Sequence, residues 1–525
     1  METNEIMPTV TPSWPEFASG AAANGTYMLT ANYAVVGTLS LNANITIVFA
    51  GGRFTGGGTI NGNNSTFVAP PVPVFDTTIN FSGTWKMEKV YAENFGDTNV
   101  ANAAPVINKA LGFSNISGCT VQLLGKTYTV TQTINILGST TLEGTICAPS
   151  YISDSAVSKT GTKIEMLASV LLINILTNGN TSGSIDCYRF VLRNLALYTT
   201  GAGDIINITA NGTLSPRHGI LENLIISHYN SNPGYSVKIA GGSYIRLERI
   251  AVTGGKGFLL ANPTNPSAFQ EFIWMRQIAF NSTYSAYPNP PSNIEINQGN
   301  HIYLTEIDVN DAQIGILLKT AQPGRSIHNV YMQKITAIRC YKAFSFNANY
   351  EYMGKIKVLD SSIFLKNTNG SVAFEFLKTG SYNISDSVFD TTNIDKEGGS
   401  GHYTITDANT GVINCRFLNF RIPSGETYNC TLKGGTRNNE LNFVNVQKSN
   451  TVTASGSGVT RTVNLVSNYS PFPAKPVVVV STNQKIPFSV ATTNTTGGAC
   501  QLQLEFASTP SGTVYVSYYL TGFYE

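Results

Sequence analysis

A pattern of apolar and polar positions recurs along the middle of the chain, from Leu192 to Phe417. Each repeat has one apolar residue, two polar residues and then an apolar–x–apolar triplet, as in Leu192–Leu197. Such a pattern predicts a strand, a two-residue bend and a second strand whose alternate residues point inward. The equivalent apolar positions recur at a nearly constant spacing, at Leu195, Leu224, Ile250, Ile278, Ile307, Ile335 and Ile363.

The resulting period of about 28 residues is typical of solenoid proteins. No stretch of ten residues with helical periodicity separates the repeats, and the LxxLxLxxN consensus of leucine-rich repeats is absent. We therefore expect an all-β fold, a right-handed single-stranded parallel β-helix, rather than a leucine-rich repeat. In such a fold equivalent residues lie on neighbouring coils about 4.8 Å apart, so the repeat also predicts which side chains are neighbours.

The two ends of the chain depart from this pattern. Residues 1–25 are rich in Pro, Ala and Gly and are predicted to form an attachment arm, and residues 26–90 read as a small β module with Gly-rich turns. The β-helix is expected over residues 91–448. After a Ser/Thr/Gly linker, residues 449–525 contain strand-like runs. These predict a sandwich-like C-terminal β-rich domain that caps the solenoid or holds chains together as a trimer.

Composition and charge exclude several classes of function. The chain has 525 residues, of which 12% are charged, and its net charge is +2 with no Lys/Arg cluster, so we expect no nucleic-acid partner. No apolar run is long enough to predict a membrane span, and the first residues do not resemble a secretory signal. We expect no cofactor and no metal, because the five histidines and seven cysteines lack metal-ligand spacing. The cysteines are expected to be buried, reduced thiols.

One segment carries a resemblance to a known family. Phe95-Gly96-Asp97, an expected short helix at 103–111, Gly118–Leu123 and Gly125–Val130 follow one another in this order. This arrangement resembles the start of pectate-lyase-like β-helices, although Gly125-Lys126 replaces the usual Pro-x-Gly and the usual acidic pair is absent. The resemblance implies that the segment caps the β-helix and has no catalytic role.

Charged residues at the bends have a structural explanation. The two-residue bend carries Arg193, Glu222, Glu248, Arg276, Thr305 and Gln333 in its first column, and Asn194, Asn223, Arg249, Gln277, Glu306 and Lys334 in its second. Opposite charges on adjacent coils stabilise parallel strands. We therefore expect Arg193 to lie beside Glu222, Glu248 beside Arg276, and Glu306 beside Lys334, rather than a catalytic use of these glutamates.

Three other carboxylates are candidates for glycan cleavage, which needs paired acidic groups. Asp308 lies between inward Ile307 and Val309 and so points outward, and its coil neighbours are expected to be Ala279 and Thr336. Asp311 follows at the next turn, and Glu295 is also predicted to point outward. The alternative is that all three are ordinary solvated surface acids.

An outward stripe of large side chains is the second candidate site. With Ile245, Ile273, Ile302 and Val330 inward, the alignment places Arg246, Trp274, Tyr303 and Tyr331 outward on successive coils. Stacked aromatic rings can bind the apolar faces of sugar rings. They could equally form a subunit interface or be covered by loops of the same chain, such as the long loop 284–291.

The whole layout resembles a bacteriophage tailspike or tail fibre, and the Gly-rich stretch 51–64 also resembles modules in phage and surface proteins of Bacteroidetes. The resemblance implies a homotrimer that attaches to the virion tail or baseplate through its N-terminus and is assembled in the cytoplasm of the host bacterium. It also implies a spike that binds, and in many cases depolymerises, a host cell-surface glycan. Two alternatives stay open, a non-enzymatic receptor-binding or structural fibre and a bacterial polysaccharide lyase or hydrolase.

Overall fold

The computed structural model divides into two compact units, unit 1 with residues 1–251 and 263–268 and unit 2 with residues 252–262 and 269–525. The structure describes the following residues: 23–145, 161–176, 189–210, 215–263, 270–281, 291–378, 382–397, 403–407, 412–413, 415–421, 429–431, 439–444, 452–453, 457, 459–466, 477–494, 500–511 and 513–524. Most of the predicted arm, residues 1–22, and most of the predicted loop, residues 282–290, lie outside these ranges.

The first part of unit 1 is already a parallel solenoid, with shorter coils than the sequence repeat of the middle. Its strands are β1 (Thr26–Leu29), β2 (Tyr33–Ala34), β3 (Thr38–Ser40), β4 (Thr46–Phe49), β5 (Phe54–Thr55), β6 (Thr59–Val68) and β7 (Asn80–Trp85). Thr26 pairs with Thr46 and Thr46 with Thr66, so each coil here begins at one of these threonines and ends just before the next. All pairings within this module are parallel.

An asparagine in the left-handed region closes each of these short coils. Asn24, Asn44 and Asn64 have φ values of 64°, 58° and 53°, a conformation that asparagine tolerates better than most residues. The Asn44 side chain donates a hydrogen bond of 2.8 Å to Asn24 Oδ1. The predicted β module is therefore built on a repeat of its own, with buried aromatic side chains such as Phe54 inside.

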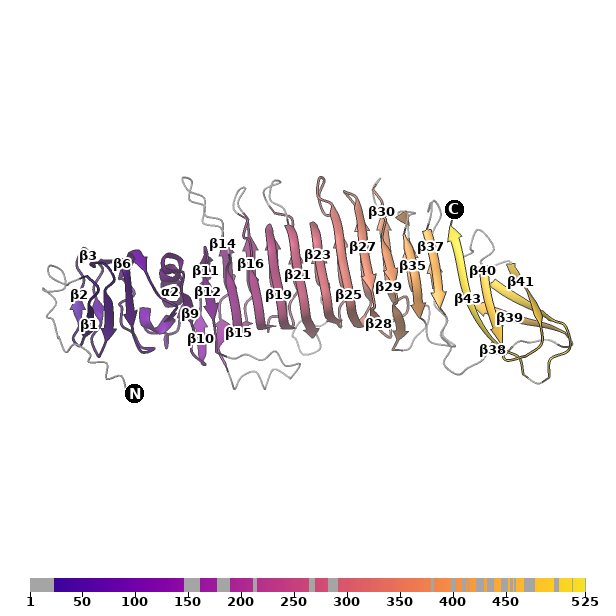
Figure 1. Cartoon of the computed structure of the whole chain (residues 1–525), viewed down its shortest axis with the longest axis horizontal. Helices are drawn as coiled ribbons and strands as arrows, with labels where there is room; N and C mark the ends of the chain where they lie inside the picture. Colours follow the sequence, from indigo (N-terminus) through magenta and orange to yellow (C-terminus); the bar gives the residue numbers. More distant parts are fainter. Residues whose placement is uncertain are drawn as a thin grey trace. The chain divides into compact units, whose positions relative to one another are not determined.

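A helix lies between the short coils and the longer ones. After β8 (Lys89–Tyr91) and the 3-10 turn η1 (Ala92–Phe95), the helix α2 runs over Ala104–Ser117 and ends at Gly118 in the left-handed region. Figure 1 places α2 between β6 and β11 of unit 1. Buried Phe113 contacts Phe81, Trp85 and Phe95, with ring centroids 4.9–5.4 Å apart. The predicted helix is present and continues six residues beyond Leu111.

The longer coils of unit 1 have three faces. Face 1 contains β8, β9 (Thr120–Gln122), β12 (Thr141–Glu143) and the first parts of β15 (Val191–Thr199), β17 (Ile220–His228) and β19 (Gly242–Thr253). Face 2 contains β10 (Thr127–Val130), β13 (Lys163–Met166) and the second parts of β15, β17 and β19. Face 3 contains β11 (Ile134–Leu137), β14 (Ile173–Leu176), β16 (Ile206–Thr209) and β18 (Val237–Ala240).

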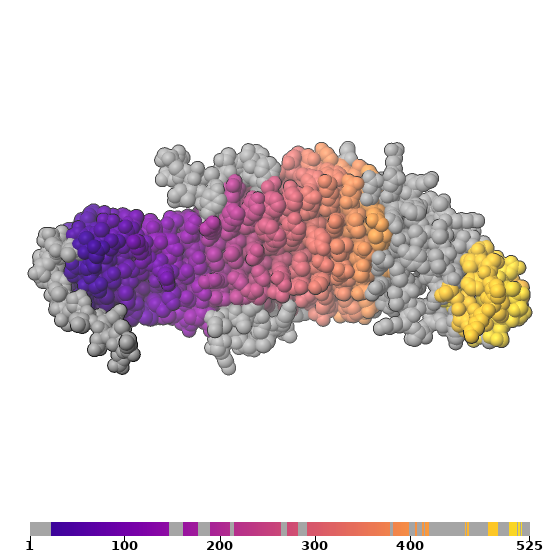
Figure 2. Space-filling view, in the orientation of Figure 1, coloured from indigo at the N-terminus to yellow at the C-terminus, as the bar shows by residue number. Residues whose placement is uncertain are grey.

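Unit 2 repeats the three faces. Its first coils consist of β20 (Phe258–Leu260), β21 (Gln270–Asn281), β22 (Ser292–Ile296), β23 (Gly299–Asn310), β24 (Ile314–Lys319), β25 (Ile327–Cys340), β26 (Lys342–Ala348), β27 (Met353–Leu359), β28 (Ser362–Leu365) and β29 (Val372–Lys378). The following strands are β30 (Ile384–Ser385), β31 (Val388–Asp390), β32 (Asn393–Lys396), β33 (Tyr403–Asp407), β34 (Val412–Ile413), β35 (Arg416–Arg421), β36 (Asn429–Thr431) and β37 (Asn439–Val444). In the space-filling view the coils from β21 to β32 lie against one another in sequence order, coloured pink to orange (Figure 2).

Non-glycine residues in the left-handed region separate face 1 from its neighbours. At the bend between faces 1 and 2, φ lies between 50° and 59° at Asn194, Asn223, Arg249, Gln277, Glu306, Lys334 and Asp360. These residues are the second column of the predicted bend. A further column with φ between 50° and 59° precedes face 1 at Arg189, His218, Tyr244, Phe272, His301, Asn329, Lys355 and Asp386. The sequence pattern did not reveal this column, because its residues share no chemical character.

The interior confirms the predicted inward positions. The repeat positions Leu195, Leu224, Ile250, Ile278, Ile307, Ile335 and Ile363 are at most 2% exposed. Phenylalanine rings form stacks inside unit 2: Phe344 lies over Phe374 with ring centroids 5.1 Å apart and an angle of 4°. Such a stack combines apolar burial with favourable ring packing. The fold is therefore an all-β parallel β-helix, as the repeat predicts.

The C-terminal strands are antiparallel. They are β38 (Val452–Thr453), β39 (Thr460–Val466), β40 (Val477–Thr482), β41 (Phe488–Asn494), β42 (Cys500–Phe506) and β43 (Tyr515–Tyr524). β39, β42 and β41 form one sheet, while β43 pairs with β38, β40 and the last long parallel strand β37. β43 therefore covers a sheet edge that would otherwise expose unpaired backbone groups.

The predicted cysteine chemistry is confirmed where side chains are described. Cys119, Cys340 and Cys415 are free thiols and at most 1% exposed. Burial raises the pKa of Cys340 and of Cys415 to about 12, so both stay protonated and unreactive at neutral pH. Cys147 and Cys187 lie outside the described residues, as do the side chains of Cys430 and Cys500.

Candidate functional site

Three aromatic rings stand outward on consecutive coils of unit 2. Trp274, Tyr303 and Tyr331 are in register on β21, β23 and β25, on face 1. The rings of Trp274 and Tyr303 are nearly parallel, with an angle of 8° and centroids 6.0 Å apart. Tyr331 follows at 6.4 Å from Tyr303 with a tilt of 47°. We call these three residues the aromatic platform; each is half-buried and so presents part of its ring to the surface.

Two further rings extend the aromatic platform on its bend side. Phe272 and His301 occupy the left-handed bend that precedes face 1, and their rings stack with centroids 4.7 Å apart and an angle of 9°. Phe272 also lies 6.2 Å from Trp274. The sequence alignment missed both residues, because at a left-handed position a side chain falls outside the in–out alternation of a strand. The signal that was available is the spacing of Phe272 and His301 along the chain, which matches the coil repeat.

The opposite side of the aromatic platform is polar. Glu306 lies between two cations, 3.7 Å from Arg276 Nε and 3.6 Å from Lys334 Nζ. The predicted pair of Glu306 and Lys334 is therefore present. The Tyr331 hydroxyl donates to Gln333 Oε1 at 3.1 Å, and Gln333 Nε2 donates to Asp360 Oδ2 at 3.0 Å. These contacts fix one end of the aromatic platform and leave its polar edge with both charge signs.

The other predicted charge ladder is present in unit 1 with altered partners. Arg193 lies in register with Glu222, as expected, but its ion pair is with Glu143 on the preceding coil, at 2.8 Å. Glu222 pairs instead with Arg249, which also contacts Glu248 at 3.0 Å. Arginine reaches either neighbouring coil, so register alone does not decide its partner. Arg246, the fourth member of the predicted stripe, is exposed on β19 of unit 1.

The three candidate carboxylates lie at different places on the coil. Asp308 is on face 2 of β23, in register with Ala279 and Thr336 as predicted. The bend at Glu306 separates it from Tyr303 on face 1. Glu295 is on face 3, in β22, with Leu259 and Leu317 as its register neighbours. The coil therefore does not gather these acids into one cluster with the aromatic platform.

Asp311 has a strong partner of its own. It sits at a bend with φ 53°, and its two carboxylate oxygens each accept a hydrogen bond of 2.7 Å from Arg339 on the next coil. The hydrogen bond to Asp311 raises the pKa of Arg339. A bidentate pair of this kind fixes the orientation of the carboxylate. This geometry suits a structural ladder, and a role as electrostatic support, better than a role as a proton donor.

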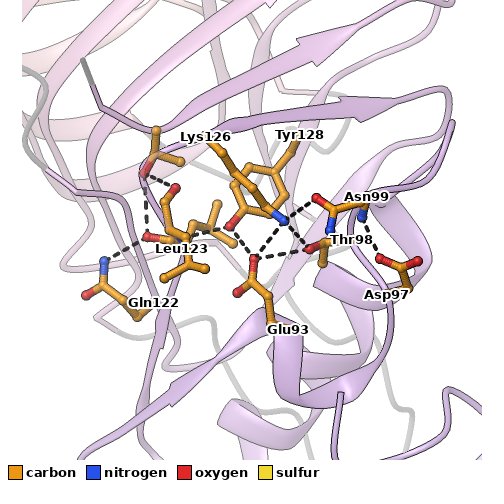
Figure 3. A network of polar contacts seen from close by, with 10 residues as sticks. Glu93, Asp97, Thr98, Asn99, Gln122, Leu123, Lys126 and Tyr128 are labelled. Carbon is orange, nitrogen blue, oxygen red and sulfur yellow. Dashed lines mark hydrogen bonds and ion pairs between the residues drawn. The ribbon is translucent and has the colours of Figure 1, made fainter. Parts of the chain in front are cut away.

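A buried polar network in unit 1 joins three ionisable groups away from the aromatic platform (Figure 3). The Tyr128 hydroxyl donates to Glu93 Oε1 at 2.6 Å, and Lys126 Nζ lies 3.4 Å from the same oxygen. Lys126 also donates to Thr98 and Asn99. Burial, together with the bond to Glu93, raises the pKa of Tyr128.

This network is structural, because Tyr128 is fully buried and Glu93 is only 5% exposed, so a polymer cannot reach them. It joins η1 and the segment after it to the strand β10. Lys126, which directly precedes β10, is the cation that lies beside Glu93. The departure from the Pro-x-Gly pattern at Gly125-Lys126 is explained by this bond. Among the described residues, no group of three or more His, Cys, Asp or Glu side chains is placed to hold a metal ion, and no helix is long and apolar enough to span a membrane.

No protein-family model matches the sequence, and no curated protein matches it. Several solved structures do. A mutant tailspike protein of the Escherichia coli bacteriophage HK620, in complex with a pentasaccharide, is 12% identical, with a TM-score of 0.41 over 95% of this chain and 86% of that chain. A tailspike protein of the Acinetobacter baumannii bacteriophage Fri1, a capsular polysaccharide depolymerase, is 11% identical, with a TM-score of 0.34 over 83% and 86%.

The A-module of the mannuronan C-5 epimerase AlgE6 of Azotobacter vinelandii is 13% identical, with a TM-score of 0.41 over 66% of this chain and 97% of that chain. The solved structures similar to this chain thus include phage tailspikes, in agreement with the resemblance noted in the sequence. The part of that resemblance that concerns phages of Bacteroidetes stays a prediction. At identities of 11–13% and TM-scores below 0.5, these similarities say nothing about what this chain binds.

Proposed function

We propose that the protein is a bacteriophage tailspike or tail fibre that binds a host surface polysaccharide along the aromatic platform. The observation that carries the proposal is the nearly parallel stacking of Trp274 and Tyr303 on consecutive coils, continued by Tyr331. Rings spaced by the coil repeat match a ligand that is itself a repeat of similar rings. The apolar faces of sugars pack on aromatic rings, while their hydroxyl groups find polar partners at the edge.

The polar edge of the aromatic platform supports this assignment over a subunit interface. Arg276, Lys334 and Gln333 lie beside the rings, and the side chains of Arg276 and Lys334 are 55% and 59% exposed. The cores of stable subunit interfaces are depleted in lysine side chains such as Lys334. A row of partly solvent-exposed aromatic rings that is bordered by hydrogen-bonding groups instead fits a polyhydroxylated ligand.

The test is a binding measurement with immobilised capsule and lipopolysaccharide extracts from a panel of bacterial strains. We expect saturable binding to the surface glycan of at least one strain, and we expect Trp274→Ala to remove most of it. Tyr350→Ala is the matched control, because Tyr350 is 47% exposed and lies outside the aromatic platform. Equal loss in both variants, or none in Trp274→Ala, would contradict the proposal.

We further propose Asp308 as the carboxylate to examine for cleavage of the bound glycan, with Asp311 and Glu295 as the other acids. Asp308 lies one bend away from the aromatic platform, and its register neighbours Ala279 and Thr336 have small side chains that leave room beside it. If incubation with the bound glycan releases reducing ends or unsaturated uronate absorbance, Asp308→Asn should abolish that release. Unchanged release in Asp308→Asn would exclude this residue, and no release from the wild-type protein would favour a non-enzymatic fibre.

The assembly is also a proposal. We expect a homotrimer whose N-terminal arm attaches to the tail or baseplate, and a virion component that is assembled in the host cytoplasm. Light scattering after gel filtration checks the trimer, and a stable monomer would count against the spike assignment. Genes for virion parts beside this one would separate a phage spike from the remaining alternative, a bacterial polysaccharide lyase or hydrolase.

A further inference from the structure

Two lysines lie on the coil that follows Tyr331, the last residue of the aromatic platform. Lys357 on β27 is the register partner of Tyr331, so it continues the row of Trp274, Tyr303 and Tyr331 on the next coil. Lys355 stands two residues earlier, at the left-handed bend with φ 55°. Phe272 holds the same position beside Trp274. The row of aromatic rings is thus followed by a pair of exposed lysines, and in the bend column Asn329 lies between His301 and Lys355.

Two carboxylates near these lysines, Asp386 and Asp360, accept hydrogen bonds from other side chains. Asp386, which follows the bend position of Lys355 on the next coil, accepts hydrogen bonds from the Tyr352 hydroxyl at 3.0 Å and from Ser385 Oγ at 2.7 Å. Asp360 accepts from Gln333 Nε2 at 3.0 Å. Within the described ranges, no ion pair to Lys355 or Lys357 is found, in contrast to Lys334, Arg339 and Lys342 of the same unit.

The packing around Tyr352 keeps this arrangement in place. The His328 ring lies 5.0 Å from the Tyr352 ring, and a Cβ at Gly354 would collide with the Tyr352 hydroxyl. Glycine at position 354 therefore lets the hydroxyl reach Ser385 and Asp386. Burial, and then the charge of Lys355, lowers the pKa of His328, so this histidine adds no third cation that would itself need a partner.

Lys355 and Lys357 are two residues apart, and the repulsion between two such like charges is relieved when an anion binds between them. In the same unit, Lys334, Arg339 and Lys342 each pair with a carboxylate. We propose that Lys355 and Lys357 form an anionic subsite at the end of the aromatic platform, and that the protein recognises an acidic polysaccharide whose sugar carboxylates bind there. This inference rests on the proposed function, because it assumes that a glycan lies along the rings.

The experiment compares one glycan in two forms. A capsule or lipopolysaccharide extract to which the full-length protein binds is divided, and in one half the sugar carboxylates are reduced to primary alcohols. Binding to both halves is measured at low and at high salt concentration. The variants are Lys355→Gln/Lys357→Gln, Trp274→Ala and the control Lys319→Gln/Lys485→Gln, in which two lysines away from the aromatic platform lose the same total charge. Thermal unfolding checks that each variant is folded.

We expect the wild-type protein to bind the native glycan at least tenfold more tightly than the reduced glycan, with a clear loss at high salt. The Lys355→Gln/Lys357→Gln variant should lose that preference and bind both forms like the wild-type protein binds the reduced one. The control should keep the preference. Equal wild-type affinity for both forms, or an equal loss for both forms in the lysine variant, would overturn the anionic subsite while leaving the aromatic platform intact. Unchanged binding by Trp274→Ala, or no binding to any extract of the panel, would overturn the proposed function itself.

Discussion

The same position of the coil is filled differently in the two units. In unit 1, the outward position at the start of face 1 holds Val191 and Ile220, which are register neighbours and half-buried, and then the exposed Arg246. In unit 2, it holds Trp274, Tyr303 and Tyr331. The backbone does not require this change, because the bends that precede and follow face 1 have the same left-handed φ values in both units.

Charged side chains show the same contrast. In unit 1, Arg193 and Arg249 are joined to Glu143, Glu222 and Glu248. In unit 2, Lys355 and Lys357 are exposed, and the nearby carboxylate of Asp386 accepts hydrogen bonds from two hydroxyl groups. A solenoid keeps its coils in register with cross-coil pairs. Unit 2 keeps such pairs at Glu306 and Asp311, and beside them it has aromatic rings and lysines without an ion pair among the described residues, which fits the ligand that we propose.

The largest expected effect concerns a buried histidine of unit 1. His228 of unit 1 is 1% exposed, and burial lowers its pKa to about 4, from 6.5 in an exposed histidine. The unfolded chain therefore binds a proton between these two pH values that the folded chain does not. We expect this group's contribution to stability to be constant above pH 6.5 and to fall by about 3 kcal/mol as the pH drops towards 4. Chemical unfolding at a series of pH values measures the slope.

The His228→Gln variant should lose most of this slope, since glutamine does not titrate. His218→Gln is the control, because His218 is an exposed residue of the same unit that stacks on Tyr244. His328, whose pKa is also lowered, contributes in the same direction in both variants and does not affect their difference. A slope that is equal in His228→Gln and in the wild-type protein would show that His228 does not carry it.

Ligand binding should distinguish directly between the aromatic side chains of unit 2 and the apolar side chains of unit 1 at the outward position of face 1. We expect Trp274→Ala to weaken glycan binding by about 2 kcal/mol, or roughly thirtyfold in Kd, as for a central aromatic residue of an interface. Ile220→Ala removes an outward apolar side chain at the equivalent position of unit 1, and we expect no change in Kd. Titration calorimetry with the purified glycan measures both. Similar losses in the two variants would mean that binding extends over face 1 of both units.

Much of the fold could be predicted because it repeats. Seven inward positions and the second bend column follow from the nearly constant spacing of the middle repeat, and the outward row of Trp274, Tyr303 and Tyr331 follows from the same alignment. The repeat of the first coils was also available in the sequence, since Asn24, Asn44 and Asn64 are evenly spaced. It escapes an alignment that is based on the longer period of the middle of the chain.

The candidate site could be predicted less well, for a geometrical reason. Register along the stack is a property of the sequence, whereas the direction of a side chain around the coil depends on the bends. Asp308 and Tyr303 are five residues apart, but the left-handed residue Glu306 places them on two faces. The partner of Arg193 depends on side-chain reach, and the occupied state of Asp386 depends on the distant residue Tyr352. The periodicity of the sequence reveals neither the partner of Arg193 nor the hydrogen bonds of Asp386.

The smallest expected effect compares a cation in an ion pair with one that has no ion pair among the described residues. Arg249 contacts Glu222 and Glu248 and donates to Asn223 Oδ1 at 2.6 Å, with 39% of its side chain exposed. We expect Arg249→Gln to lower the free energy of unfolding by about 1 kcal/mol, after allowing for screening by solvent. Glutamine fits the backbone here, because Gln277 occupies the equivalent bend position of unit 2 with φ 54°.

We expect Lys357→Gln, in contrast, to leave the free energy of unfolding within about 0.5 kcal/mol of the wild-type value, because this lysine has no ion pair among the described residues. Urea unfolding of the two variants, followed by circular dichroism, measures the difference. A stabilising Lys357→Gln would agree with relief of repulsion from Lys355. If Lys357→Gln destabilised the protein as much as Arg249→Gln does, the lysine would be part of the structural ladder, and the contrast between the two units would have to rest on the aromatic rings alone.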